Sequence, residues 1–155
     1  LSDFIHKSSR YIVNQLVSND VCALYVGHNT GWKQDTGMGR VNNQNFVDIP
    51  HTTFIAMLKY KCQLAGIAFF ENEESYTSKC SFLDNEDICK HDVYAGRRVH
   101  RGLFKASDGR LINADVNGAL NILRKCKPEA FADGVVGVVV HPVIARMANG
   151  FIDFH

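Results

Sequence analysis

Two short apolar runs on either side of a helical pattern constrain the fold of this chain more than any other feature. Residues 21–26 and 67–70 are continuous apolar runs, a pattern typical of strands that are covered on both faces. Between them, apolar side chains recur at three- and four-residue spacing over residues 49–66, with Pro50 in the first turn and Gly66 at the natural stop. Strand, helix and strand in this order form a βαβ unit, so we predict an α/β fold with two parallel strands.

Two more helices and a turn-rich segment complete the predicted elements. Amphipathic spacing predicts a helix over residues 2–19, and Asn113 suits the N-cap of a last helix that runs through Lys125. Residues 77–104 predict irregular structure with one or two short hairpins, and residues 107–109 form a clear turn signal. The apolar positions that we expect this last helix to bury are Val116, Ala119, Leu120, Ile122 and Leu123.

Composition places the chain among ordinary globular proteins. Apolar residues make up 46% and charged residues 21% of the 155 positions, enough for a real core. The longest apolar run, residues 134–140, is too short to cross a membrane, and no export signal opens the sequence. The chain begins with Leu1 rather than Met, so we expect a fragment of a longer protein. Without an export signal or a membrane span, we expect that protein to be cytoplasmic and to have no membrane partner. Five scattered cysteines without a C-x-x-C pair predict reduced thiols, with Cys22 and Cys62 in the core.

Basic residues are concentrated in the second half of the sequence. Residues 97–127 carry eight Lys and Arg against two Asp and Glu, which points to a polyanionic partner such as nucleic acid, although many such runs are simply solvated surface. Aromatic residues accompany the charges, as in Trp32 beside Lys33 and Tyr94 near Arg97, a mixture that suits nucleic-acid backbones and stacked bases. The alternative for Tyr94, together with Phe104, is the core of a small hairpin.

Carboxylates follow the second predicted strand and open the last helix. Glu71, Glu73 and Glu74 follow the apolar run, where open α/β sheets gather their catalytic groups, and Asp115 lies in the first turn of the helix. Clustered carboxylates of this kind can hold Mg²⁺ for phosphodiester cleavage. A solvated loop explains the glutamates equally well, and the helix dipole alone favours an aspartate at the position of Asp115.

Zinc is not expected in this chain. Cys80, Cys89 and His91 have the spacing C-x₈-C-x-H, without the second ligand pair that a structural zinc site normally needs. No Ser-His-Asp pattern supports a nucleophilic hydrolase either.

Several motifs, taken in order, resemble the C-terminal part of the TnpB (OrfB) family of transposon-associated nucleases, relatives of type V CRISPR effectors. The motifs are residues 74–81 (ESYTSKCS), 101–104 (RGLF) and 112–122 (INADVNGALNI), joined by residues 29–34 (NTGWKQ) and 42–46 (NNQNF). The resemblance covers nearly the whole chain, and its Thr-Ser-Lys and Asp-x-Asn-Gly-Ala-x-Asn-Ile motifs in this order are specific.

This resemblance implies a partial RNase H-like (RuvC) fold of parallel strands and helices, interrupted by a zinc-ribbon-like insert that binds the target nucleic acid. Residues 1–78 would form the RuvC-like core, 79–111 the insert, and 112–155 the last catalytic helix and the tail. Members of the family, which are called transposases and act in transposition and DNA recombination, cut DNA with Mg²⁺ (or Mn²⁺) under the guidance of a transposon-encoded RNA. Asp115 matches the family's last catalytic aspartate. The side chains that we expect to contact nucleic acid are Lys79, Arg97, Arg98, Arg101, Lys105, Trp32 and Lys33.

The sequence departs from the family pattern at three places. The strand that carries the first catalytic aspartate is absent, and Gly27 stands where the second carboxylate usually follows its strand. Glu74, or less favourably Glu73, could replace that carboxylate from the neighbouring strand end and hold the metal with Asp115. The cysteine pairs of the ribbon are also absent, so we expect a zinc-free insert with a small apolar core of Phe82, Leu83, Ile88, Val93, Tyr94 and Leu103. The chain alone is expected to be inactive or weak, and the alternative is a non-catalytic DNA- or RNA-binding module with a degenerate RNase H-like fold.

Overall fold

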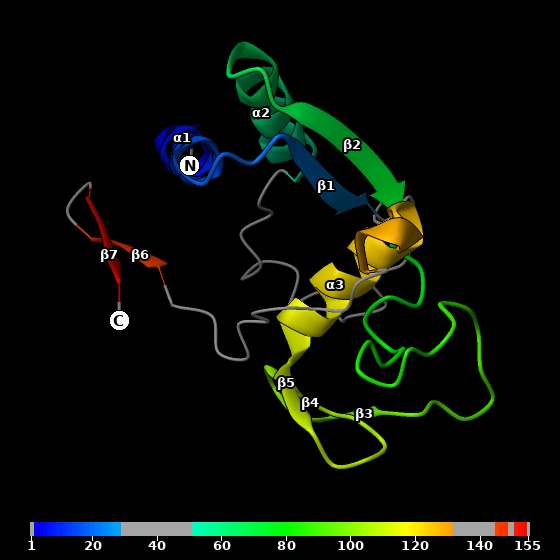
Figure 1. The fold of residues 1–155 in the computed structure, drawn as a ribbon. Helices are drawn as coiled ribbons and strands as arrows, with labels where there is room; N and C mark the ends of the chain where they lie inside the picture. The colour runs from blue at the N-terminus through cyan, green and yellow to red at the C-terminus, as the bar shows by residue number, and fades with distance from the viewer. Residues whose placement is uncertain (1, 29–50, 132–144, 149–150, 155) are drawn as a thin grey trace, which may run out of the picture. The chain divides into compact units, whose positions relative to one another are not determined.

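The structure, a computed structural model, describes residues 2–28, 51–131, 145–148 and 151–154 (Figure 1). The chain divides into two compact units, Leu1–Glu73 and Glu74–His155, which are described separately below. This division falls five residues before the boundary at residue 78 that the sequence suggested. Among the helices of the described residues, none is long and apolar enough to span a membrane.

The first unit contains the βαβ arrangement that the sequence predicts. Its elements are α1 (Ser2–Ser18), β1 (Ala23–His28), α2 (His51–Leu64) and β2 (Ala68–Glu73). The strands pair in parallel, from Ala23 opposite Ala68 to His28 opposite Glu73, because α2 lies in the connection and returns the chain to the same end of the sheet. Gly66 adopts a φ of 74° just after α2, as a helix-stopping glycine commonly does. The parallel pair is therefore confirmed.

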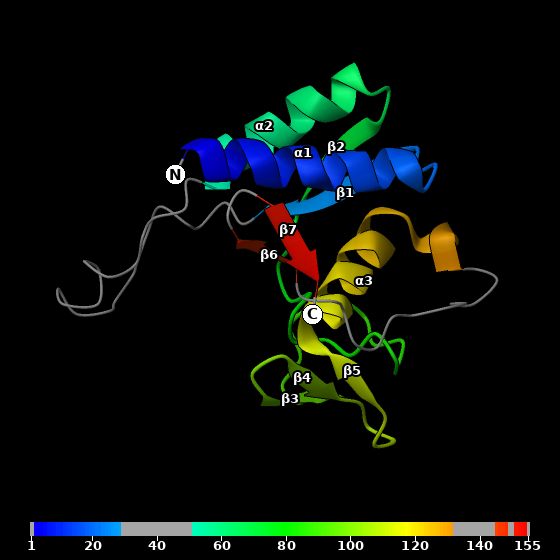
Figure 2. The same cartoon turned by 90° about the vertical axis from the view of Figure 1, so that its left-hand side faces the viewer.

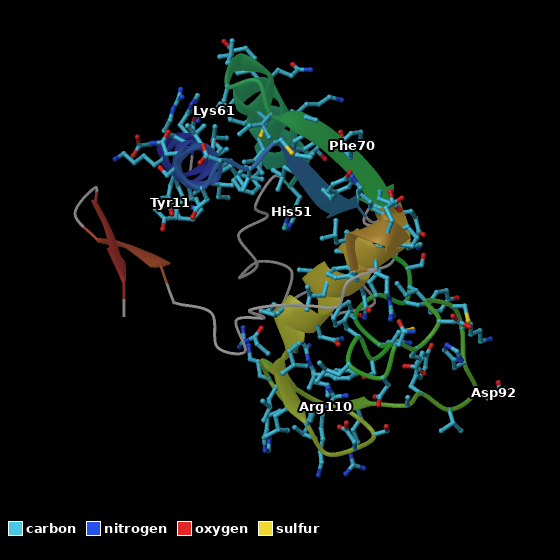
Figure 3. The ribbon with its side chains drawn as sticks, in the orientation of Figure 1. Tyr11, His51, Lys61, Phe70, Asp92 and Arg110 are labelled. Atoms are coloured by element: carbon cyan, nitrogen blue, oxygen red, sulfur yellow. The ribbon has the colours of Figure 1, made fainter. Side chains whose placement is uncertain are left out.

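The core of this unit lies between the two helices and the sheet. Val13, Leu58, Cys62 and Ile67 are each at most 5% exposed and form one cluster. Beside them, the ammonium group of Lys61, itself 4% exposed, donates hydrogen bonds to the His6 carbonyl and to Ser9 Oγ, each 2.6 Å long (Figure 3). Burial lowers the pKa of Lys61 below its usual value, and nearby Arg10 adds to the effect. A polar link from α2 to α1 thus accompanies the apolar contacts.

The prediction of strands buried on both faces is wrong. β1 is half-buried along its length and β2 is mostly exposed, with Phe70 46% exposed although its ring stacks on Tyr25 at 4.8 Å. The described helices cover the sheet only in part, so the continuous apolar runs did not predict how buried the strands are. Cys62 is buried as predicted, whereas Cys22 is exposed, since it precedes β1 and lies outside the cluster.

The second unit joins a small antiparallel sheet to a helix (Figure 2). Its elements are β3 (Arg97–His100), β4 (Leu103–Lys105), β5 (Leu111–Asn113), α3 (Ala114–Cys126), the 3-10 helix η1 (Pro128–Phe131), β6 (Ala145–Ala148) and β7 (Phe151–Phe154). The sheet order is β3-β4-β5, and β6 pairs with β7 in an antiparallel hairpin. The turn at residues 107–109 connects β4 to β5, with Gly109 at a φ of 91°. The predicted turn and the mixed α/β character are confirmed.

One face of the three-stranded sheet forms the core of the second unit. Phe104 and Ile112, register partners on β4 and β5, are each 1% exposed and cluster with Ala114 at the start of α3. Leu83, Val116 and Leu120 pack against this cluster. The apolar core expected for the insert is therefore only partly right: Val93 is 86% exposed, while Phe104, expected in a hairpin core only as an alternative, is central. The described residues do not support a zinc-ribbon character for this insert.

Candidate functional site

Asp115 lies where its carboxylate is available to a ligand. Asn113 caps α3, because its side-chain oxygen accepts hydrogen bonds from the backbone N–H groups of Asp115 (2.9 Å) and Val116 (3.1 Å). This cap, predicted from the sequence, leaves the side chain of Asp115 free of a capping role and 87% exposed. Arg98 on β3 approaches it, with 3.8 Å between Nη2 and Oδ1. An ion pair this long and exposed contributes little stability, so a cation could displace Arg98 easily.

Two asparagines of the same helix motif are buried and hold the preceding segment. Asn117 Oδ1 accepts a hydrogen bond from the Phe82 backbone N–H (2.9 Å), and its Nδ2 donates to the Cys80 carbonyl (2.9 Å). Asn121 Nδ2 donates to the carbonyls of Thr77 and Cys80, at 2.9 and 2.8 Å. The residues 77–82 and α3 are thereby joined through two fully buried amides. Sequence reasoning missed both, although their i, i+4 spacing places them on one helix face.

Glu74 does not lie beside Asp115. Glu74 precedes a turn in which its carbonyl accepts hydrogen bonds from the backbone N–H and Oγ1 of Thr77, at 3.2 and 2.8 Å. The next residue, Ser75, has its carbonyl 3.4 Å from Nζ of Lys125, in the last turn of α3. Asp115 is in the first turn of the same helix, and ten residues of helix span about 15 Å. The structure therefore places Glu74 and Asp115 toward opposite ends of α3.

Glu73 belongs to the first unit, at the end of β2. It is exposed there and lies opposite His28 across the parallel pair. Glu71, on the same strand, has its carboxylate 3.6 Å from Nζ of Lys59. Pairing with β1 extends β2 through Glu73, so Glu71 and Glu73 lie on the strand and not in a loop beyond its end. Two residues apart on a strand, they project on the same face.

Asp115 remains a candidate for a single ligand of a divalent metal ion. Within the residues that the structure describes, no group of three or more His, Cys, Asp and Glu side chains is arranged to hold a metal ion. A carboxylate is the ligand type that Mg²⁺ prefers, so Asp115 fits as a single ligand. A complete site requires further oxygen ligands from other parts of the protein.

The cysteines and the histidine of the insert contact the backbone and one another. The Cys80 thiol, fully buried, donates to the carbonyls of Asp87 (3.4 Å) and Cys89 (3.6 Å), and burial raises its pKa. Cys89 Sγ lies 3.4 Å from His91 Nε2, which is 2.7 Å from the Asp87 carbonyl. These contacts hold the 80–91 loop together.

The predicted nucleic-acid-binding side chains fall into two groups. Arg97 and Arg98 lie on β3, Arg101 in the following turn, Lys105 at the end of β4 and Lys79 in the turn before the insert core; all five are exposed. Trp32 and Lys33 lie outside the described residues. Two other arginines of the described part of this unit, Arg110 and Arg124, are engaged by the protein. Arg110 bonds Asp108 and the Leu83 carbonyl, and Arg124 bonds Asn85 and lies over the ring of Phe82, with a pKa lowered mainly by burial.

Two comparisons with known proteins agree with this arrangement. Residues 51–122 match the family model "Cas12f1-like, TNB domain". Over 136 residues the chain is 29% identical to a "TnpB-like protein ORF457" of Acidianus two-tailed virus. Both matches support the resemblance to the TnpB family. The match to the viral TnpB-like protein covers 86% of this chain but only 24% of that relative, so the chain spans about a quarter of its length.

The residues of the segment 112–122 differ in exposure. Asp115 is exposed, whereas Asn117 and Asn121 are buried. The helix therefore presents one carboxylate to solvent while its two amides hold residues 77–82.

Proposed function

We propose that this chain is part of a transposon-associated, RNA-guided DNA endonuclease, to which it contributes the last acidic residue of a RuvC-like site and the insert that holds the target strand. Asp115 is one carboxylate ligand for Mg²⁺ or Mn²⁺. The bound ion supplies charge stabilisation and an activated water at the scissile phosphate. Arg97, Arg98 and Arg101 contact the phosphates of the DNA, and the guide RNA binds elsewhere on the longer protein.

The exposure of Asp115 carries this proposal. A capping residue two positions earlier already satisfies the first N–H groups of α3, so the fold does not need the Asp115 carboxylate for that purpose. The positive end of the helix dipole favours its ionised form. Similarity to the TnpB family supports a nuclease-related role. Glu74 is left out of the metal site because it lies toward the other end of α3.

The test uses the longer protein that contains this chain, assembled with its guide RNA and given linear target DNA and Mg²⁺. We expect Asp115→Ala to lower the cleavage rate by about 100-fold or more, which corresponds to the several kcal/mol that a metal ion contributes. Asp92→Ala, at an exposed loop position of the same unit (Figure 3), is the matched control and should cut normally. Undiminished cutting by Asp115→Ala would overturn the proposal, and a comparable loss in Glu74→Gln would restore Glu74 to the site.

One observation favours a second candidate function, a non-catalytic nucleic-acid-binding module. Gly27 lies inside β1 rather than offering a carboxylate beyond it, and the described residues gather no metal-binding cluster. In this case the 155-residue chain binds DNA or RNA with an affinity that falls steeply with salt. Calorimetric titration of the longer protein with Mn²⁺ separates the two functions: binding that Asp115→Ala abolishes supports the nuclease, and no binding supports the module.

A further inference from the structure

A cavity of about 370 Å³ opens between the start of β3 and the end of β4, and its size lies within the range of ligand sites. Its lining comes from two short segments, residues 94–97 and 105–107. Both segments belong to the second unit. We refer to it as the Tyr94 cavity.

Two cations face the cavity from the same side of the sheet. Arg97 and Lys105 are register partners in the antiparallel pair β3-β4, and partners directly opposite each other project on one face with their β-carbons about 5 Å apart. This face is opposite to the one on which Phe104 is buried. Within the described part of the chain, neither Arg97 nor Lys105 forms an ion pair, in contrast to Arg98 with Asp115 and Arg110 with Asp108. Like charges so close repel, and an anion between them would remove that cost.

An aromatic ring borders the same cavity. Tyr94 is half-buried, and His91 meets it edge-on with ring centroids 5.4 Å apart, which limits the orientations open to the phenol ring. Aromatic side chains beside cations are the combination that binds an unstacked base together with its phosphate. A duplex keeps its bases stacked inside and would present only phosphates to this cavity.

Hydrogen bonds to two carboxylates fix the walls. Glu86 accepts from the backbone N–H groups of Ala95 (2.9 Å) and Ser81 (2.7 Å), which holds the 94–97 wall. Asp84 accepts from the backbone N–H (3.0 Å) and the hydroxyl of Ser107, which holds the 105–107 wall. Gly96 lets the 94–97 wall pack closely against Phe104, since a β-carbon at residue 96 would lie 2.4 Å from the Phe104 ring. The cavity is therefore shaped before a ligand arrives.

We infer that the Tyr94 cavity binds one unstacked nucleotide of a single strand, with the base on Tyr94 and the phosphate between Arg97 and Lys105. This rests on the proposed function in one respect, that the insert binds nucleic acid, and it specifies which form of nucleic acid and where. None of the residues named distinguishes ribose from deoxyribose, so single strands of DNA and of RNA are both tested.

The experiment measures binding of the 155-residue chain to fluorescein-labelled oligo-dT, oligo-U and a duplex of equal length by anisotropy. Tyr94→Ala should weaken binding to a single strand about 5- to 100-fold, the usual effect of losing one base stack, with duplex binding unchanged. Tyr94→Phe should restore it. Arg97→Gln and Lys105→Gln should each lower the slope of log affinity against log salt by about 0.7, one phosphate contact on a single strand. Lys90→Gln, exposed in the loop before Tyr94, is the matched control.

A second measurement does not depend on variants that must fold. Oligo-dT that contains iododeoxyuridine is irradiated on the wild-type chain, and the cross-linked peptide is identified by mass spectrometry; Tyr94 is expected at the cross-link. Unchanged single-strand affinity in Tyr94→Ala, equal losses on single strand and duplex, or a cross-link confined to other residues each overturns the Tyr94 cavity while leaving the proposed function in place. If the wild-type chain binds none of the three probes at low salt, nucleic-acid binding by the insert is overturned as well.

Discussion

At the scale of single residues, the helix motif that carries Asp115 shows what sequence reasoning could and could not find. The cap at Asn113 was predictable, because a side-chain oxygen before a helix has one evident use. The burial of Asn117 and Asn121 was not, because amphipathic spacing assigns amides to solvent. They are buried because residues 77–82 have backbone groups, such as the Phe82 N–H and the Thr77 carbonyl, that form hydrogen bonds with these amides and not with a strand or helix backbone. That need is not visible in the helix's own residues.

Asn117→Ala should destabilise the second unit by about 2–4 kcal/mol. The substitution leaves the buried N–H of Phe82 without an acceptor and the Cys80 carbonyl without one of its donors, and each such loss costs about 1–3 kcal/mol. The neighbouring Gly118→Ala is the control: no atom lies within 4 Å of the added carbon, so it should be neutral or stabilise the helix by up to about 1 kcal/mol. Urea unfolding followed by circular dichroism measures both, and equal effects would contradict the role of the amide.

Asp84 should make stability depend on pH below about 4. Burial acts to raise the pKa of this carboxyl, but the hydrogen bonds from Ser107 and Ser81, together with Arg110, outweigh burial and hold the pKa below its usual value. A depressed folded-state pKa contributes stability that is fully present above the unfolded value near 3.9 and is lost as the pH falls through the folded value. At pH 7 we expect Asp84→Asn to cost about 1 kcal/mol, the lower end for a bond to a charged group because the site is partly exposed.

The same variant provides the pH test. Unfolding free energies of wild type and Asp84→Asn are compared from pH 7 to pH 2.5, and their difference should shrink below pH 4. Asp92→Asn, at an exposed position, should follow the wild type throughout. A difference that stays constant across this range would show that the Asp84 charge has no part in holding Ser107.

At the scale of elements, connectivity could be predicted better than burial. The order strand, helix, strand fixes parallel pairing whatever surrounds it, and the pair from Ala23 to His28 has that geometry. The exposure of β2 depends on what covers the sheet, which the run of residues 67–70 does not encode. The same limit applies to the glutamates: pairing with β1 extends β2 through Glu73, so Glu71 and Glu73, which the sequence placed after the strand, lie on it.

Gly96→Ala should destabilise the β3-β4 pair by about 1–3 kcal/mol, the usual cost of overpacking. A β-carbon at residue 96 would lie 2.4 Å from Cε1 of Phe104 and 2.8 Å from the Lys105 carbonyl oxygen, and Phe104 is the centre of the core. Gly102→Ala separates packing from backbone strain, because residue 102 has a φ of 80° but its nearest neighbour is 3.9 Å away. Thermal unfolding measures the stability of both variants. The anisotropy assay should show that Gly96→Ala, and not Gly102→Ala, also weakens single-strand binding at the Tyr94 cavity.

At the scale of the whole molecule, physical reading of the residues indicated a basic surface and separate carboxylates, and the resemblance to a family connected them. In the second unit, the predicted insert and the last helix are joined by a common core. The insert and α3 share the cluster of Phe104, Ile112 and Ala114, so the insert cannot form its core without the helix. Such a shared core depends on contacts between distant residues, which composition and periodicity do not report.

Removal of divalent metal should leave the second unit folded. Side-chain hydrogen bonds join the segment 83–84 to the turn between β4 and β5: Ser107 donates to Asp84, and Arg110 donates to the Leu83 carbonyl. The cluster around Phe104 adds apolar burial. We therefore expect a zinc chelator such as TPEN, or excess EDTA, to shift the melting temperature of the 155-residue chain by less than about 1 °C. Asp84→Asn, in contrast, should lower it by about 2–4 °C, the shift that about 1 kcal/mol produces in a chain of this size. Chelator-induced melting, together with zinc in the purified protein by elemental analysis, would show that Cys80, Cys89 and His91 hold a metal after all.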